Sequence, residues 1–150
     1  MLLVGGGRLV TRDPQRPFLE DGGVLCYWGL VREVGSTGDL RGRYPDVPFL
    51  DASGGVIHPG FINAHMHCYS ALVRGFGGKG GEPASTFLEV LQRLWWRLDK
   101  ALTLEDVKVS GLVCLVEAIR CGCTTLLDHH ASPRAIPGSL FALGEAVRES

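Results

Sequence analysis

The spacing of apolar residues changes at Gly54-Gly55, and this change limits the folds that the chain can adopt. Before it, the apolar segments are short and lie between turn residues, which is typical of β-strands. We predict strands at residues 2–4, 9–11, 24–27, 30–34 and 49–52. Asp21-Gly22-Gly23 and Trp28-Gly29 are predicted hairpin turns, and Gly5-Gly6-Gly7 is interpreted as a turn because no helix follows it. Residues 1–55 are therefore expected to form a β region, which makes a small sandwich only if it packs against a partner layer.

After Gly55, strand and helix patterns alternate. Thr86 and Glu89 form a capping-box pair at the start of a helix whose apolar residues recur every three or four positions. A second helix is predicted to begin at Thr103 and to end before Gly122. Residues 124–128 are interpreted as a buried strand, and a last helix begins at about Ser139. This alternation is typical of parallel βαβ units, so we predict an α/β fold.

The composition excludes several classes of partner. Among 150 residues, 15 Lys and Arg stand against 16 Asp and Glu, and no basic block occurs. Nucleic acids and acidic membrane surfaces are not expected partners, because phosphate binding depends on clustered positive charge. The sequence has no run of about 18 apolar residues and no secretory leader, so we expect a cytoplasmic protein. Its five cysteines lack the C-x2-C spacing of structural zinc sites and are interpreted as reduced thiols.

The segment 59–67, Pro-Gly-Phe-Ile-Asn-Ala-His-Met-His, carries the most informative polar residues. In a strand, His65 and His67 share one face with Phe61 and Asn63, because successive side chains alternate. The two histidines are spaced about 6.6 Å along the strand, a span that two imidazoles can close over a cation. A shared metal ion is one interpretation, and a polar strand end is the other.

Segment 59–67 resembles the metal-binding motif of the amidohydrolase superfamily. Further likenesses follow the order found in its cytosine deaminase and chlorohydrolase-like branch, at residues 72–75, 95–96, 102–106 and 124–128. Residues 128–133 are most similar to the aminohydrolases called SsnA. The resemblance implies that residues 1–55 are part of a β-sandwich domain and residues 56–150 part of a TIM (β/α)8 barrel domain. It also implies that His65 and His67 bind a divalent metal, with zinc as the first choice and iron as the alternative.

The activity implied by the resemblance is hydrolysis of a non-peptide carbon–nitrogen bond, as in deaminases, or of a carbon–chlorine bond, by a metal-activated water acting on a small molecule. Members of the family complete the metal site with histidines and an aspartate from later strands of a barrel of about 250 residues. The resemblance therefore implies an N-terminal fragment in which no catalytic residue is assigned. The alternative is an inactive truncated chain, or one half of a split enzyme that works only with a complementary fragment. The expected partners are the C-terminal portion of the same enzyme or further copies of the chain, and the apolar helix faces are expected to be exposed.

Four further residues are candidates for contacts with the substrate or with the metal ligands: Arg74, Asp128, His129 and His130. Arg74 suits a substrate carboxylate or ring oxygen, and a surface ion pair is the alternative. Asp128 and His130 share strand phase whereas His129 points the other way, and a polar strand end is again the alternative.

Several other features have structural interpretations. Burial is expected for Cys68, for Cys121 and Cys123, and for Trp95 and Trp96. The glycine-rich segment 75–81 lacks the spacing of a phosphate-binding loop, and we interpret it as a mobile loop over the barrel mouth.

Overall fold

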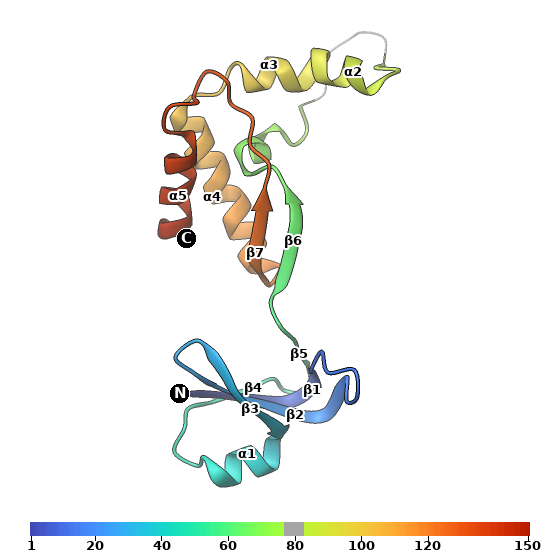
Figure 1. The fold of residues 1–150 in the computed structure, drawn as a ribbon, viewed down its shortest axis with the longest axis vertical. Helices are drawn as coiled ribbons and strands as arrows, with labels where there is room; N and C mark the ends of the chain where they lie inside the picture. Colours follow the sequence, from blue (N-terminus) through green and yellow to red (C-terminus); the bar gives the residue numbers. More distant parts are fainter. Residues whose placement is uncertain (77–82) are drawn as a thin grey trace. The chain divides into compact units, whose positions relative to one another are not determined.

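The computed structural model describes residues 1–76 and 83–150. These residues form two compact units, Met1–Pro59 and Gly60–Ser150 (Figure 1). Most of the glycine-rich segment 75–81 lies outside the described residues, so its interpretation as a mobile loop stays a prediction. Within the described part of the chain, no helix is both long enough and apolar enough to cross a membrane.

The first unit is a five-stranded sheet in the order β3-β2-β1-β4, with β5 also paired to β1. Its strands are β1 (Leu2–Val10), β2 (Phe18–Tyr27), β3 (Leu30–Ser36), β4 (Phe49–Asp51) and β5 (Val56–Ile57). The first three are antiparallel, whereas β4 and β5 run parallel to β1. All five predicted segments lie in strands, and the two segments predicted at 2–4 and 9–11 belong mostly to β1. The hairpin turn at Trp28-Gly29 is confirmed, since both residues have positive φ between β2 and β3.

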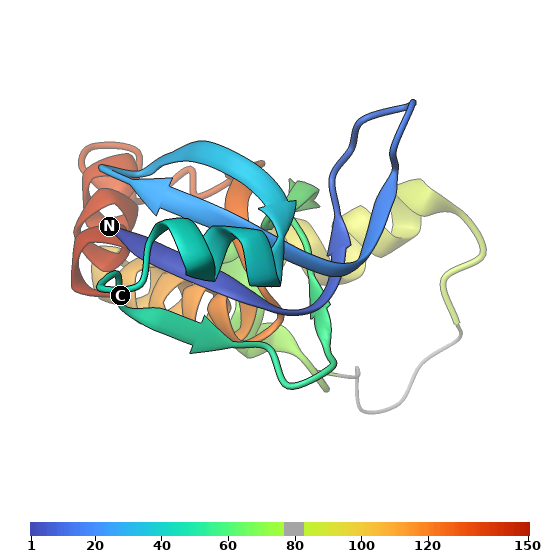
Figure 2. The same ribbon diagram turned by 90° about the horizontal axis from the view of Figure 1, so that it is seen from below.

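The helix α1 (Thr37–Arg43) covers one face of this sheet (Figure 2). It begins where the Ser36 hydroxyl accepts a hydrogen bond from the backbone N–H of Asp39, at 3.1 Å. Leu3, Leu25 and Leu40 are almost fully buried and form the core between the helix and the sheet. The sequence analysis did not predict this helix.

Two glycine-rich segments that were predicted as turns lie inside strands. Gly22 belongs to β2 and pairs with Gly7 of β1, and a Cβ at Gly22 would overlap the side chain of Leu9. Gly6 lies in β1 at an irregularity of register and has a φ of 77°. The turn predictions at 21–23 and 5–7 were wrong, because glycine serves here for close approach and for a bulge within the strand pair.

The second unit contains a parallel βαβ arrangement. Its elements are β6 (Phe61–Met66), the 3-10 segment η1 (Cys68–Val73), α2 (Phe87–Val90), the π-helical turn η2 (Leu91–Trp95), α3 (Trp96–Asp99), α4 (Leu104–Arg120), β7 (Cys123–Asp128) and α5 (Ser139–Glu149). The strands β6 and β7 pair in parallel, with α4 between them in the chain. Figure 1 shows α4 beside β7, with α5 against α4. These strands and helices confirm the predicted α/β alternation, and α2, η2 and α3 follow one another as the helix predicted from residue 86.

The ends of α4 lie where the sequence predicts them. The Thr103 hydroxyl accepts a hydrogen bond from Asp106 N at 3.2 Å, and the Asp106 carboxylate accepts one from Thr103 N at 2.8 Å. Gly122 follows the helix with a φ of 74°. The capping residues therefore stop and start this helix as the pattern of side chains indicates.

The strand β7 is not buried as the sequence analysis predicted. Thr124, Thr125 and Leu127 are exposed, because within the described residues β7 has one neighbouring strand and few contacts with α4. The helix α4 also presents an apolar stripe to solvent. Its members, each between 41% and 55% exposed, are Val109, Val113, Val116 and Ile119. The expectation of uncovered helix faces named Leu112, Leu115, Val116 and Ile119 on this helix and is confirmed only for the last two, since Leu115 is buried and Leu112 half-buried.

Candidate functional site

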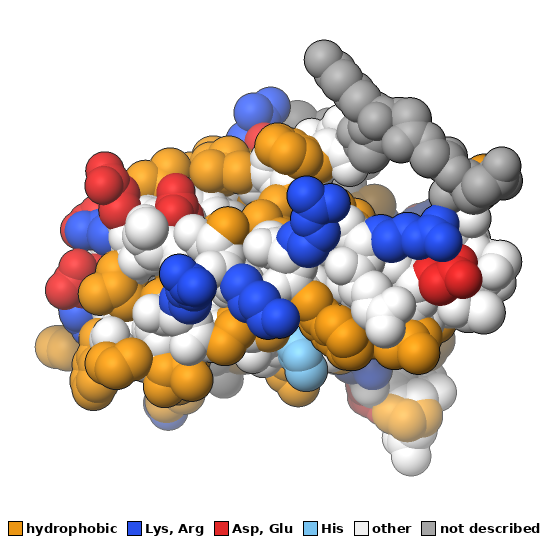
Figure 3. Space-filling model, turned by 90° about the horizontal axis from the view of Figure 1, so that it is seen from above, with side chains coloured by type: hydrophobic (Ala, Val, Ile, Leu, Met, Phe, Trp, Pro, Cys, Tyr) orange, Lys and Arg blue, Asp and Glu red, His pale blue; other side chains and the backbone are white. Residues whose placement is uncertain are grey.

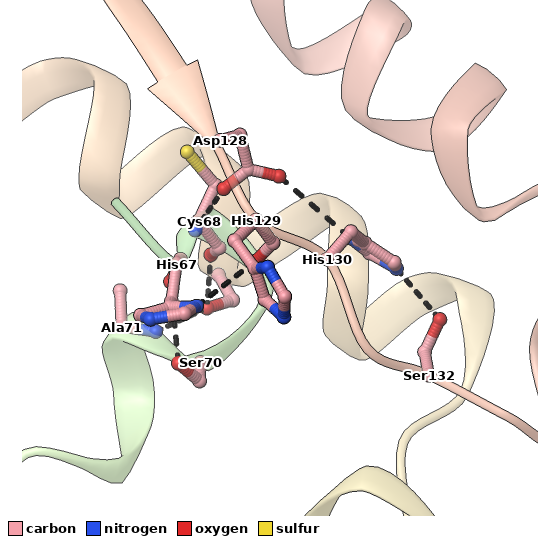
Figure 4. A network of polar contacts seen from close by, with 9 residues as sticks. His67, Cys68, Ser70, Ala71, Asp128, His129, His130 and Ser132 are labelled. Atoms are coloured by element: carbon pink, nitrogen blue, oxygen red, sulfur yellow. Dashed lines mark hydrogen bonds and ion pairs between the residues drawn. The ribbon is translucent and has the colours of Figure 1, made fainter. Parts of the chain in front are cut away.

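The carboxyl ends of β6 and β7 meet, and this brings the segments that follow both strands together. The register pairs Met66 with Asp128. The backbone N–H of His129 donates to the carbonyl of Met66 at 2.8 Å, and the backbone N–H of Cys68 donates to Asp128 Oδ1 at 2.7 Å. These two bonds tie the last residues of one strand to those of the other, and the bond between Cys68 and Asp128 is drawn in Figure 4.

Three histidine rings lie next to one another at this strand end. The ring centroids of His65 and His67 are 5.0 Å apart, and those of His67 and His129 are 5.1 Å apart. His65 lies in β6 and His67 directly follows that strand, and the distance between their rings places the two imidazoles side by side. The structure thus places two imidazoles where they can act together.

The ring of His67 is oriented by the backbone of the neighbouring strand end. Its Nδ1 lies 2.9 Å from the carbonyl oxygen of His129 (Figure 4). A carbonyl oxygen only accepts hydrogen bonds, so this contact places the proton of the neutral ring on Nδ1. The unprotonated Nε2 then keeps its lone pair, which is the form in which an imidazole binds a metal ion.

The histidines alone do not complete a metal site. Among residues 1–76 and 83–150, no three His, Cys, Asp or Glu side chains are grouped so that they could hold one ion. Catalytic zinc sites normally have three protein ligands. His65 and His67 therefore fit a divalent metal as part of its donor set, because both are imidazoles on one side of a strand end and the tautomer of one is fixed.

Asp128 and His130 contact each other beyond this pair of rings. His130 Nδ1 lies 3.9 Å from Asp128 Oδ2, and His130 Nε2 lies 2.6 Å from the Ser132 hydroxyl (Figure 4). Burial lowers the pKa of His130, whereas the Asp128 carboxylate acts in the opposite direction. The network fixes the path of the chain directly after β7.

Arg74 stands apart from this network. It is exposed at the end of η1, and no hydrogen bond or ion pair involves its side chain within the described part of the molecule. Its proposed substrate contact therefore stays a prediction. The neighbouring Cys68 is buried as expected, and burial raises the pKa of its thiol.

Sequence reasoning missed three polar residues around the site. The Ser110 hydroxyl of α4 hydrogen-bonds two backbone groups of η1. Tyr69 and Asp99 are both buried. Burial raises the pKa of Asp99, and burial raises the pKa of Tyr69 to about 12. Ser110 could have been noticed in the sequence, because it is a polar residue at a helix position with the apolar residues Val107 and Cys114 at three- and four-residue spacing.

Aromatic and apolar side chains border the histidines. Trp95 lies near His67, with 6.3 Å between ring centroids, and is half-buried, whereas Trp96 is largely exposed. The burial predicted for both tryptophans is thus only partly confirmed. Seen from the carboxyl ends of β6 and β7, hydrophobic side chains reach the surface among Lys and Arg, and a histidine is visible between them (Figure 3).

Several known proteins resemble this chain in sequence. Residues 56–150 match the model of the Amidohydrolase family. The 8-oxoguanine deaminase of Pseudomonas aeruginosa is 36% identical over 128 residues, which are 82% of this chain and 27% of that protein. The 5-methylthioadenosine/S-adenosylhomocysteine deaminase of Nitratidesulfovibrio vulgaris is 29% identical over 145 residues, covering 93% of this chain and 32% of that protein.

Solved structures show the same relationship. Guanine deaminase from E. coli superimposes with a TM-score of 0.77 at 26% identity, covering 99% of this chain and 35% of the deaminase. Atrazine chlorohydrolase TrzN from Arthrobacter aurescens, complexed with zinc, superimposes with a TM-score of 0.74 at 27% identity, covering 99% of this chain and 33% of the chlorohydrolase. The chain thus spans about a third of the length of the relatives that it matches.

Proposed function

Because the chain belongs to the amidohydrolase family, we propose that it supplies the first metal ligands, His65 and His67, of a metal-dependent deaminase. Its relatives include three proteins named as deaminases and one named as a chlorohydrolase. The observation that carries the proposal is the contact between His67 Nδ1 and the His129 carbonyl at 2.9 Å, which leaves Nε2 free beside the ring of His65.

The residues of this chain would bind the metal ion and orient the His67 ring. The remaining metal ligands would come from outside the described residues. When bound, a divalent metal such as Zn²⁺ lowers the pKa of its water to about 7 and can polarise the carbon under attack. His67 is held in its tautomer by the His129 carbonyl, and the segment after it is held by the Asp128 carboxylate. These contacts prepare the ligand geometry before any ion arrives.

We propose zinc as the metal and iron as the alternative, because imidazole binds both. The zinc in the chlorohydrolase structure supports the first choice. Elemental analysis of protein purified without added metal distinguishes the two.

The proposed substrate is a small ring compound with an exocyclic amino group. This class is suggested by relatives whose names are 8-oxoguanine deaminase and guanine deaminase. The reaction replaces the amino group by oxygen from water and releases ammonia. No residue within this chain is assigned as the general base, and we expect no appreciable turnover by the purified 150 residues with added Zn²⁺.

Calorimetric titration with Zn²⁺ tests the metal site. We expect weak binding that strengthens as the pH rises through the histidine range, because the imidazoles must be deprotonated to bind. The double variant His65→Ala/His67→Ala should lose this binding, whereas His58→Ala, which changes a histidine of the first unit, should keep it. Unchanged binding by the double variant would mean that cysteines or other histidines hold the ion, and the proposal would be wrong.

We further propose that additional βα units, either continuous with this chain or on a separate chain, cover the exposed face of the second unit. The support comes from the stripe on α4 formed by Val109, Val113, Val116 and Ile119, and from relatives about three times as long. Exposed apolar surface of this kind favours association. We therefore expect the purified chain to form aggregates or oligomers, and supply of the missing units to increase its solubility.

Size-exclusion chromatography with light scattering tests this second proposal. The double variant Val113→Lys/Val116→Lys should shift the chain towards the monomer. Glu117→Lys reverses a charge on the same helix outside the stripe and should leave the distribution unchanged. A monomeric unaltered chain with a sharp cooperative unfolding transition would show that the second unit needs no covering partner.

A further inference from the structure

The segment that follows His67 is fastened to α4 by one side chain. The Ser110 hydroxyl donates to the carbonyl of Cys68 at 2.8 Å and accepts from the backbone N–H of Ala71 at 2.7 Å. Ser110 is 1% exposed, and both its hydrogen-bonding roles are used by η1. A single hydroxyl thus closes one turn of η1 against the helix.

The position of Ser110 differs from that of an ordinary helical serine. Serine within a helix commonly bonds a carbonyl of its own helix or points to solvent. Ser110 does neither, and it lies on the buried face of α4 with Val107 and Cys114, at three- and four-residue spacing. A polar group on such a face is costly to bury unless it is hydrogen-bonded, and here two backbone groups of η1 satisfy it.

The bonds of Ser110 complete a set that surrounds the backbone of His67. The N–H of Cys68 is held by Asp128 Oδ1, and its carbonyl is held by Ser110. The carbonyl of His67 accepts from the backbone N–H of Ser70 at 3.1 Å and lies 3.2 Å from the Ser70 hydroxyl (Figure 4). With this backbone fixed, the His67 ring reaches the His129 carbonyl in one orientation.

We propose that Ser110 is a positioning residue for His67: by fixing η1 it holds the imidazole in the Nδ1-protonated tautomer that presents Nε2 to a metal ion. Ser110 touches neither the ring nor the ion, and it acts through the backbone of Cys68 and Ala71. The proposal rests on the proposed metal site, but its effect on the tautomer of His67 exists without metal. Sequence reasoning identified His67 but gave no role to a serine 43 positions later in the chain.

The test compares the full chain carrying Ser110→Ala with the unaltered chain. Nitrogen NMR of isotope-labelled histidine rings, recorded without metal, reports the tautomer of His67. Calorimetry with Zn²⁺ reports the affinity. We expect the Nδ1-protonated form of His67 to lose its dominance in Ser110→Ala, and the zinc affinity to fall about tenfold, as is typical when residues that orient a metal ligand are removed.

Two further variants separate positioning from general stability. Ser139→Ala removes an equally buried hydroxyl at the start of α5, which packs against α4, and it should change neither readout. Ser110→Thr keeps the hydroxyl and should restore the tautomer and most of the affinity. If Ser110→Ala fails to fold, Ser110→Cys keeps the size with a weak donor, and the same two readouts apply to it.

The outcomes are distinct. An unchanged His67 tautomer in folded Ser110→Ala or Ser110→Cys would overturn the positioning role, and so would equal effects of Ser110→Ala and Ser139→Ala. Absence of zinc binding by the unaltered chain would refute the proposed metal site, while the tautomer measurement would still decide the role of Ser110.

Discussion

The two units of the molecule differ in the contacts that stabilise each of them internally. The first unit encloses the apolar side chains of Leu3, Leu25 and Leu40 between a sheet and a helix. In the second, the site end depends on hydrogen bonds between side chains and backbone, while a stripe of α4 stays exposed. Large apolar side chains are exposed in both units, so the difference lies in the polar contacts that fix the site end of the second unit. Site geometry and apolar burial can thus be tested separately.

The largest effect is expected from the core of the first unit. Leu40→Ala removes a fully buried side chain and should lower the free energy of unfolding by about 2–5 kcal/mol. Chemical denaturation followed by circular dichroism measures the loss. Leu30→Ala, at a position 66% exposed, serves as the control and should have little effect. Equal losses of unfolding free energy in the two variants would contradict this difference between the units, because the first unit would then not depend on its core.

The next effect is expected at the site end. Asp128→Ala leaves the backbone N–H of Cys68 without its acceptor, and we expect a loss of about 1–3 kcal/mol in the stability of the second unit. Hydrogen exchange at the Cys68 amide should become faster. Asp128→Asn keeps an acceptor oxygen and should lose less. A Cys68 amide that stays protected in Asp128→Ala would show that polar bonds are not what holds this end.

A smaller effect is expected at the start of α4, and it depends on pH. The hydrogen bond from Thr103 N lowers the pKa of Asp106. A lowered pKa in the folded chain means that ionised Asp106 stabilises it above the ordinary aspartate pKa and loses this contribution as the pH falls through the lower value. Asp106→Ala should therefore cost about 1 kcal/mol near neutral pH and less at a pH well below the ordinary aspartate pKa of about 3.9. Thermal unfolding at both pH values measures this, and Glu105→Ala, one residue away, should show no such dependence.

The smallest effect is expected between α4 and α5. Lys108 Nζ lies 2.6 Å from Glu149 Oε1 and 3.4 Å from Glu145 Oε2 at the surface. Lys108→Met should lower the stability only slightly, because exposed ion pairs contribute little. Denaturation at low and high salt should show the difference shrinking with salt. A large loss of stability that salt does not change would mean that the aliphatic part of Lys108 stabilises the helix pair by apolar packing instead.

The repeating patterns of the sequence predicted most of the fold. Alternation and helical spacing gave β6, α4 and β7 near their observed ends, because side-chain period and capping residues act locally. Gly22 and α1 show the limit of this reasoning. Glycine permits a turn, but it also permits the close pairing of two strands, and only the neighbouring strand decides between them. Whether β7 is buried likewise depends on what covers it, which no local pattern contains.

For the candidate site, the sequence predicted the neighbours along one strand but not the contacts between strands. The side-by-side rings of His65 and His67 follow from strand alternation. The contact of His67 with residue 129 depends on the register of β6 against β7, which joins positions 62 apart. Ser110 could have been noticed as a polar residue on an apolar helix face, but its partner in η1 could not have been named.

The acceptor for His67 Nδ1 is a backbone carbonyl, and this has a consequence for how the site tolerates change over evolution. Any amino acid at position 129 brings the same carbonyl, so the side chain there can drift while the contact persists. Proline is the exception, because it would remove the N–H that bonds Met66 and draws the two strand ends together. As far as this contact is concerned, the side chain at position 129 can therefore change, provided that its backbone still donates to Met66.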